Sequence, residues 1–147
     1  MGRLDNKVAL VTGSTSGIGL GIAKVLAKSG AQLILNGFGD ASKAIAEVGQ
    51  FGGQVGHHPA DVCDPAQIAE LFAYAEREFG GVDILFNNAG ICICTEAETM
   101  TLEQWRKVVD VDLTAQFLMA RAAGQRMIKA GKGGAIISTA SMSGHIV

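Results

Sequence analysis

The chain has 147 residues, of which 48% are hydrophobic and 18% are charged, and its formal net charge is −2. This composition excludes an intrinsically disordered protein, which would be poor in apolar and rich in charged residues. The balance of 12 basic against 14 acidic residues leaves no basic excess to neutralise phosphates, so no nucleic acid is expected as a partner. A chain of this length is expected to form one domain, residues 1–147.

The three cysteines, Cys63, Cys92 and Cys94, are an odd number in a chain that is not small, which favours a reducing cytoplasm over a secreted disulfide framework. Cys92 and Cys94 could be metal ligands, but no Cys/His pair stands at ligand spacing elsewhere. Free, partly buried thiols and no metal site are therefore expected. No secretory leader opens the chain, and the longest uncharged run, residues 8–23, is shorter than the ~20 apolar residues of a membrane span. We expect a cytoplasmic protein without membrane contact.

Short apolar runs alternate with longer amphipathic runs in the first part of the chain. The runs that predict strands are residues 7–12, 32–35 and 54–58. The first of them is almost continuously apolar, which is typical of a strand covered on both faces of a parallel sheet. Helical spacing of apolar residues predicts one helix from Ile18 to Gly30 and a short helix around Ile45 and Val48.

The second part of the chain carries two helix-start signals. Asp64-Pro65-Ala66-Gln67 combines a capping side chain with proline in the first turn, and the helix that it opens runs to Phe79. Thr101-Leu102-Glu103-Gln104 is a capping box that opens one long helix ending near Ala130. Residues 82–86 and 135–139 predict the remaining strands.

This alternation of strands and helices predicts the α/β class. The expected architecture is a Rossmann-type, doubly wound parallel sheet with helices on both faces. Five strands are expected, in the order 3-2-1-4-5.

A glycine cluster follows the first strand and opens the first helix. Gly13 permits a tight turn, Gly17 lets a pyrophosphate approach the backbone, and Gly19 lets the helix pack closely on the strand. The helix N-terminus offers unpaired N–H groups to phosphates. A nucleotide site is favoured over an ordinary glycine-rich turn. The residues expected to bind the cofactor here are Gly13, Ser14, Thr15, Ser16, Gly17, Ile18 and Gly19.

Two motifs together give a specific signature. Thr12-Gly13-x-x-x-Gly17-Ile18-Gly19, with Asn87-Asn88-Ala89-Gly90 after the fourth strand, resembles the short-chain dehydrogenase/reductase family over the whole chain. Residues 1–91 look most like the bacterial 3-hydroxybutyrate dehydrogenases of that family. From Cys92 onward the chain looks more like its polyol and sugar-type members, through divergence or a chimera.

The end of the second strand bears on the choice between NAD and NADP. Gly37 stands where NAD-preferring dehydrogenases usually place an acidic side chain for the ribose hydroxyls. No lysine or arginine lies between Lys28 and Lys43, and Ser16 is not basic, so a 2′-phosphate would find no cation and NAD is favoured. Phe38 is expected to cover the adenine, with a half-buried loop aromatic as the alternative.

The resemblance implies further cofactor contacts. Asp61, by its side chain, and Val62, by its backbone, would contact the adenine. Asn88, Ala89 and Gly90 would border the cofactor and brace the sheet. Asn and Gly also tolerate left-handed backbone conformations, so this turn is plausible from the residues alone.

The family's catalytic groups are Asn, Ser, Tyr and Lys, and the chain matches them only in part. The serine matches Ser141, which could be confused with its neighbour Ser143. Asp112 stands in the asparagine slot and adds a charge where a neutral amide would hold a water. The family's Tyr-x-x-x-Lys would fall beyond Val147, and the one tyrosine, Tyr74, lies inside the third helix.

The resemblance implies an NAD-dependent oxidoreductase that transfers hydride between NAD and a secondary alcohol or ketone, with 3-hydroxybutyrate or a polyol or sugar as substrate. Without the tyrosine and lysine, this chain alone is expected to be inactive. The alternatives are a non-catalytic dinucleotide-binding module and a folding fragment. An apolar fifth strand at a sheet edge and apolar surface on the long helix predict self-association or poor solubility, and a homo-oligomer is expected.

Overall fold

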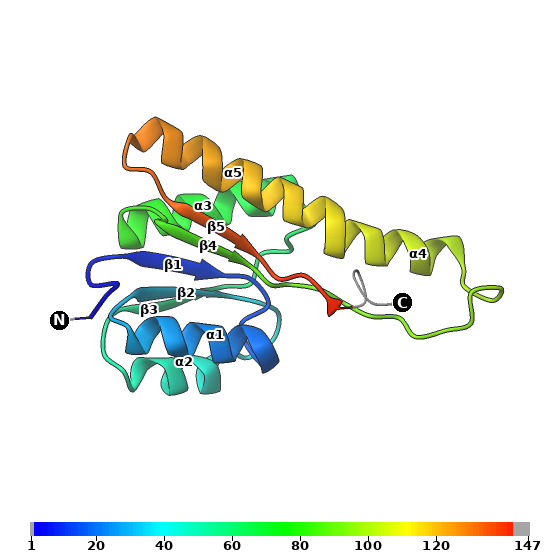
Figure 1. Ribbon diagram of the computed structural model, residues 1–147, viewed down its shortest axis with the longest axis horizontal. Coiled ribbons are helices and arrows are strands. Elements are labelled where there is room, and N and C mark those ends of the chain that lie inside the picture. The colour runs from blue at the N-terminus through cyan, green and yellow to red at the C-terminus, as the bar shows by residue number, and fades with distance from the viewer. Residues whose placement is uncertain (1, 143–147) are drawn as a thin grey trace.

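The computed structural model describes residues 2–142. Five parallel strands form one sheet in the order β3-β2-β1-β4-β5 (Figure 1), which confirms the predicted class and strand order. The strands are β1 (Val8–Val11), β2 (Gln32–Asn36), β3 (Val55–His58), β4 (Ile84–Asn87) and β5 (Ala135–Ser138).

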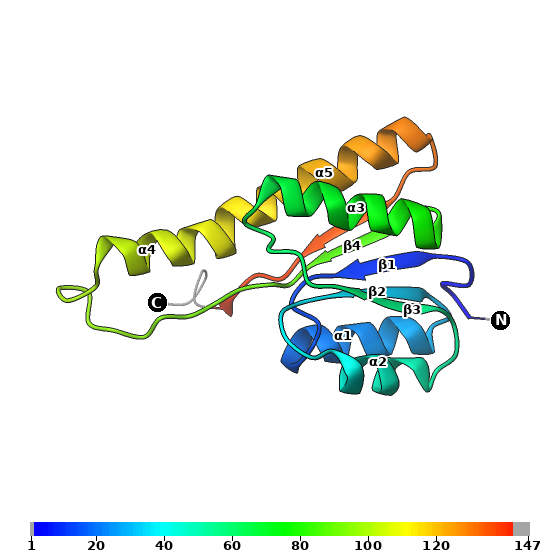
Figure 2. The ribbon, with the colours of Figure 1, turned by 180° about the vertical axis from the view of Figure 1, so that it is seen from behind.

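Helices cover both faces of the sheet. α1 (Gly17–Lys28) and α2 (Ser42–Gly49) lie side by side on one face. α3 (Pro65–Phe79) and α5 (Ala115–Ala130) lie on the other, as Figure 2 shows from behind. α4 (Leu102–Val109) continues the line of α5 past the end of the sheet (Figures 1 and 2).

Strand β1 divides its side chains between two hydrophobic cores. Val8 and Leu10 pack into the core beneath α3 and α5, whereas Ala9 and Val11 pack into the core beneath α1 and α2. Successive side chains of a strand point to opposite faces, so a strand covered on both sides needs apolar residues at every position. This is why residues 7–12 are an almost unbroken apolar run.

The predicted helix starts are confirmed at α3 and α4. The Asp64 carboxylate accepts a hydrogen bond from the backbone N–H of Ala66 at 2.8 Å. The Thr101 hydroxyl accepts one from the N–H of Gln104 at 3.2 Å, and the Gln104 side chain accepts one from the N–H of Thr101 at 2.9 Å. Each cap satisfies an N–H group that has no partner inside the helix.

The long helix expected from Leu102 to Ala130 is not a continuous α-helix, which corrects that prediction. A five-residue π-helical segment, Asp110–Thr114, separates α4 from α5. Such segments are rare in proteins, and those that occur are often found at functional sites. Asp112 lies in this one, and its Oδ1 accepts a hydrogen bond from the backbone N–H of Ile91. A tertiary contact therefore accompanies the change of helix type.

Four apolar residues between the start of α4 and the first turn of α5 are each between 58% and 67% exposed and are here called the exposed apolar set: Leu102, Trp105, Leu113 and Phe117. All of β5 is exposed as well. This agrees with the expectation of apolar surface along the long helix and the fifth strand. Within residues 2–142, no helix is long and apolar enough to cross a membrane.

Candidate functional site

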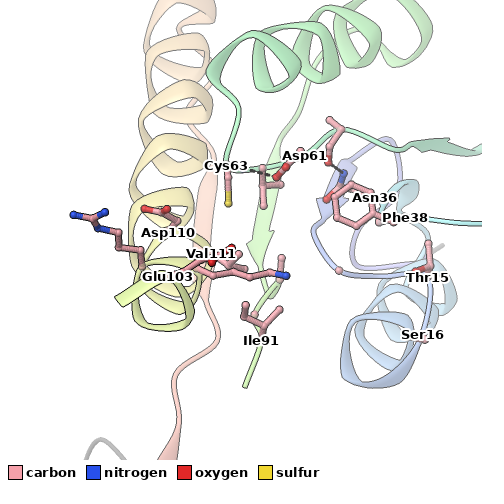
Figure 3. Close-up of a pocket in the computed structure, with 18 of the residues that line it drawn as sticks. Thr15, Ser16, Asn36, Phe38, Asp61, Cys63, Ile91, Glu103, Asp110 and Val111 are labelled. Atoms are coloured by element: carbon pink, nitrogen blue, oxygen red, sulfur yellow. Dashed lines mark hydrogen bonds between the residues drawn. The ribbon is translucent and has the colours of Figure 1, made fainter. Parts of the chain in front are cut away.

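A cavity of about 1000 Å³ opens beyond the carboxyl ends of the strands. Open α/β sheets bind ligands at this edge, where the strand order reverses. The loops after β1, β2, β3 and β4 supply one side of the cavity, and α4 with the π segment supplies the other (Figure 3). Eight of the residues predicted to bind the cofactor line it: Gly13, Thr15, Ser16, Phe38, Asp61, Val62, Ala89 and Gly90.

The turn after β1 has the shape of an anion cradle. Gly13 has φ 61° and Gly17 has φ 55°, a region that favours glycine. A Cβ at Gly17 would have no atom within 4 Å, so the approach to the helix N-terminus is open there. Ser16 is the N-cap residue of α1, but its side chain makes no capping hydrogen bond. The first N–H groups of α1 are therefore not occupied by the cap.

Gly17 and the remaining residues of the glycine cluster, Ser14, Ile18 and Gly19, lie outside the cavity lining. The Ser14 side chain is fully buried, and its hydroxyl donates to the carbonyl of Val11 at 2.7 Å and accepts from the N–H of Asn36 at 3.0 Å. Gly19 packs against Gly13 and Asn88 so closely that a Cβ would collide with the Gly13 carbonyl. Ile18 is 72% exposed.

The turn after β2 forms the rim of the cavity beside the glycine loop, which is the turn after β1 together with the first residues of α1, residues 13–19. Phe38 is 70% exposed and lies near Thr15 and Ser16 in Figure 3. Gly37 has φ 157°, and a Cβ there would lie 2.8 Å from the Thr15 hydroxyl. A larger residue in place of Gly37 would therefore press on the glycine loop.

Asp61 and Val62 follow β3 and line the cavity. Figure 3 shows Asp61 between Phe38 and the π segment. The Asp61 carboxylate accepts a hydrogen bond from the N–H of Cys63 at 2.9 Å, and its own N–H donates to the Gln67 side chain at 2.9 Å. Burial, with Asp61 alongside, raises the pKa of the Cys63 thiol to about 11. Cys63 is accordingly an inert wall of the cavity at neutral pH.

The turn after β4 is braced by Thr12. The Thr12 hydroxyl oxygen accepts hydrogen bonds from the N–H groups of Asn88 and Ala89, each at 2.9 Å. The Asn88 side chain returns a hydrogen bond to the Thr12 carbonyl at 3.1 Å. Asn88 thus joins the ends of β1 and β4, while Ala89 and Gly90 line the cavity.

The two candidate catalytic residues do not line the cavity. Asp112 lies against Gly90, where a Cβ would be 3.4 Å from its Oδ1. It reaches the cavity through Ile91, whose N–H it binds at 2.8 Å. Ser141 is exposed and follows the end of β5 at Ser138. Ser143 lies outside the described residues.

The second wall of the cavity could not be predicted from the sequence. Its residues are Leu102, Glu103, Arg106, Lys107, Asp110 and Val111. Figure 3 shows Glu103, Asp110 and Val111 across the cavity from Phe38 and Ser16. The capping box had located the start of this helix, but no sequence signal indicated that the helix faces the glycine loop.

The expectation of partly buried thiols is wrong for Cys92 and Cys94, which are both exposed. They lie in the irregular segment between β4 and α4, away from either hydrophobic core. Among the residues that the structure describes, no group of three or more His, Cys, Asp or Glu side chains could hold a metal ion.

The residues around the cavity carry features that dinucleotide sites share. The glycine loop presents backbone N–H groups and no side chain at Gly17, as a pyrophosphate requires. Phe38 offers an exposed aromatic ring, and Asp61 a carboxylate, within reach of the same space.

The model of the short chain dehydrogenase family matches residues 7–147. The chain belongs to the short-chain dehydrogenase family. A solved short-chain dehydrogenase/reductase from Mycobacterium marinum superimposes with a TM-score of 0.94 at 38% identity, covering 98% of this chain and 57% of that one.

Two curated members of the short-chain dehydrogenase family show which dehydrogenases are similar. The D-beta-hydroxybutyrate dehydrogenase of Cupriavidus necator is 49% identical over 145 residues, 97% of this chain and 56% of the relative. The D-threitol dehydrogenase of Mycolicibacterium smegmatis is 42% identical over 147 residues, 98% of this chain and 56% of the relative. Both similarities extend along nearly the whole chain, and the chain spans little more than half the length of either relative.

Proposed function

We propose that the chain is the dinucleotide-binding part of an NAD-dependent short-chain dehydrogenase. The observation that carries the proposal is that Ser16, the N-cap residue of α1 without a capping hydrogen bond, lines the same cavity as Phe38 and Asp61. The glycine loop would hold the pyrophosphate, and Phe38, Asp61 and Val62 would hold the adenosine end. Asn88, Ala89 and Gly90 would border the nicotinamide end.

The preference for NAD rests on the charge of the cavity wall. The β2 side offers Gly37 and Phe38 and no cation, which supports NAD over NADP. The cations that line the cavity, Arg106 and Lys107, come from α4 on the opposite wall. A 2′-phosphate held beside Phe38 would therefore lack a nearby countercharge from the same loop.

The proposed substrate is a small secondary alcohol or its ketone. The names of the relatives from Cupriavidus necator and Mycolicibacterium smegmatis support a D-3-hydroxy acid or a polyol. NAD, when bound, accepts the hydride. Ser141 would orient the substrate oxygen, and Asp112 would hold the loop at Ile91 in place. We also propose that the protein is located in the cytoplasm.

Titration calorimetry with NAD and NADP tests cofactor choice. Tighter binding of NAD is expected, and equal or tighter binding of NADP would contradict the proposal.

The 147-residue chain by itself is proposed to bind NAD without turnover. Tyr74 packs against His58 and Phe79, with ring centroids 5.4 and 6.0 Å away, and does not line the cavity. It therefore cannot deliver a proton to a substrate there. NADH absorbance, followed with hydroxy acids and polyols, should stay flat for both the parent chain and Ser141→Ala. Turnover that Ser141→Ala abolishes would contradict this.

A non-catalytic dinucleotide-binding module is the second candidate. The observation that favours it is that neither Asp112 nor Ser141 lines the cavity. A longer form carrying Tyr-x-x-x-Lys distinguishes the two, because only a dehydrogenase would gain activity.

Self-association is also proposed, because the exposed apolar set and β5 leave apolar surface in water. Sedimentation at tens of micromolar should show dimers or larger species. A monodisperse monomer would contradict it.

A further inference from the structure

Two exposed thiols lie side by side in the segment between β4 and α4. The sulfurs of Cys92 and Cys94 are 3.4 Å apart and share a hydrogen bond. Exposure alternates along this segment, with Ile91 and Ile93 half-buried and Cys92 and Cys94 exposed. This alternation is typical of an extended chain, in which residues two apart direct their side chains to the same side.

The pair is connected to the cavity through its neighbour in sequence. Ile91 lines the cavity, and its N–H donates to Asp112 Oδ1 at 2.8 Å. On the other side of the pair, the hydroxyls of Thr95 and Thr99 are hydrogen bonded at 3.2 Å. The segment carrying the thiols is therefore tied at both ends, and a change at the sulfurs must be absorbed between Ile91 and Thr95.

We propose that Cys92 and Cys94 are a redox-sensitive dithiol that closes to a disulfide by exchange with a small-molecule disulfide. One thiolate attacks the small disulfide, forming a mixed disulfide and releasing one thiol. The second thiolate attacks the protein sulfur of the mixed disulfide, forming the Cys92–Cys94 bond and releasing the second thiol. Two protein thiols are oxidised, and one small disulfide is reduced to two thiols.

The geometry permits the closed form at the expense of some strain. Each trans peptide spans ~3.8 Å, so the Cα atoms of residues two apart lie within about 7 Å, near the upper limit for a disulfide. The sulfurs must approach from 3.4 Å to the bonding distance of about 2.05 Å. Exposed or strained disulfides are the readily reduced ones, which suits a reversible modification.

Cys94 also influences the protonation of Cys92. The hydrogen bond with Cys94, and then the charge of the Cys94 sulfur, raise the pKa of the Cys92 thiol. Either sulfur can make the first attack, and the other then resolves the mixed disulfide.

Oxidised glutathione is the probe that tests the exchange on the full 147-residue chain. After incubation, free thiols are blocked with iodoacetamide and the intact mass is measured. The expected product has lost two hydrogens, carries no glutathione, and has one alkylated cysteine, Cys63. Stable glutathione adducts on Cys92 and Cys94, or a disulfide between two chains, would overturn the proposal.

Three variants locate the reaction. Cys92→Ser should stop at a glutathione adduct on Cys94, because the resolving thiol is gone. Cys63→Ser should still lose two hydrogens. The matched control is Ile93→Cys in a Cys94→Ser background, which moves the second thiol to the opposite side of the extended chain. Loss of two hydrogens in that control as readily as in the parent chain would show that the alignment of the pair does not matter.

The effect on the cavity rests on the proposed function. Oxidation should weaken NAD binding by roughly 10-fold if it breaks the hydrogen bond from the Ile91 N–H to the Asp112 carboxylate, because a hydrogen bond to a charged group contributes more than one between neutral groups. Cys92→Ser treated in the same way should not change its affinity. A disulfide with unchanged affinity would refute the connection to the cavity. Failure of the reduced chain to bind NAD would refute the proposed function while leaving the mass result intact.

Discussion

The hydroxyl of Thr12 accepts hydrogen bonds from two consecutive N–H groups, those of Asn88 and Ala89, each at 2.9 Å. Thr12 is 1% exposed, so these donors have little access to a substitute partner in water. One oxygen at the end of β1 thus sets the path of the chain after β4, where the proposed nicotinamide end of the cavity begins.

Thr12→Val should destabilise the chain by about 2 kcal/mol, because it keeps the shape but leaves two partly buried N–H groups without an acceptor. Thr12→Ser keeps the hydroxyl and should destabilise the chain by less than half as much. Urea denaturation of the three chains measures the difference. If valine and serine were equally well tolerated, the hydroxyl would not be what holds the turn.

Gly19→Ala and Gly21→Ala form a matched pair in the same helix. A Cβ at Gly19 would collide with the Gly13 carbonyl and lie 2.6 Å from Asn88 Nδ2, whereas one at Gly21 would have no atom within 4 Å. Gly19→Ala should therefore destabilise by about 2 kcal/mol through overpacking and weaken NAD binding. Gly21→Ala should stabilise by about 0.8 kcal/mol through helix propensity.

Thermal or urea denaturation, together with NAD titration, checks both variants. Equal effects of the two substitutions would mean that the contact between α1 and the glycine loop is looser than the structure shows.

Phe38→Arg should shift cofactor preference toward NADP by about 10-fold, since one hydrogen bond to a charged group contributes roughly 1.5–3 kcal/mol. Phe38 lies on the exposed rim of the cavity beside Ser16, where the loop after β2 offers no cation to a 2′-phosphate. Calorimetric titration with both dinucleotides gives the ratio. Phe38→Leu is the control, because it removes the ring without adding charge, and it should weaken both cofactors. An unchanged NAD to NADP ratio in Phe38→Arg would place the adenosine end elsewhere.

The thiol of Cys63 should make stability fall with rising pH in the alkaline range. Burial raises its pKa from 9.0 to about 11 in the folded chain. The folded state therefore keeps its proton where the unfolded state has lost it. The resulting stabilisation is fully present below pH 9 and is lost as pH rises through about 11. Cys63→Ala removes this contribution, so the unfolding free energy should fall less steeply between these pH values than in the parent chain.

The fold could be predicted closely because its signals are local. Residues 7–12 and 32–35 are apolar at nearly every position, as strands covered on both faces must be, and the caps at Asp64 and Thr101 mark helix starts by their own hydrogen bonds. The π-helical segment could not be predicted. No glycine or proline interrupts residues 110–114, and the contact that accompanies it joins Asp112 to a residue far away in sequence.

The candidate site could also be predicted only in part, where its residues carry local signals. The glycine loop and the turn after β4 carry motifs, and the structure brings them to one cavity. The wall made by α4 was missed because residues such as Arg106 and Val111 carry no motif and reach the cavity only through the direction in which α4 leaves the sheet. The exposure of Cys92 and Cys94 was not predicted, because the expectation of partial burial rested on the general tendency of free thiols to be buried and not on a signal in this segment.

The division of the β1 side chains between two cores has a consequence for cooperativity. Leu10 and Val11 are both fully buried but belong to opposite cores, so neither helical layer can open without exposing one side of this strand. The amide protons of β1 should exchange with solvent only through global unfolding, whereas those of β5, whose residues are all exposed, should exchange through local fraying. The turn that carries Gly13 therefore emerges directly from the slowest-exchanging part of the sheet, which keeps the proposed pyrophosphate cradle in shape while the edges of the molecule fluctuate.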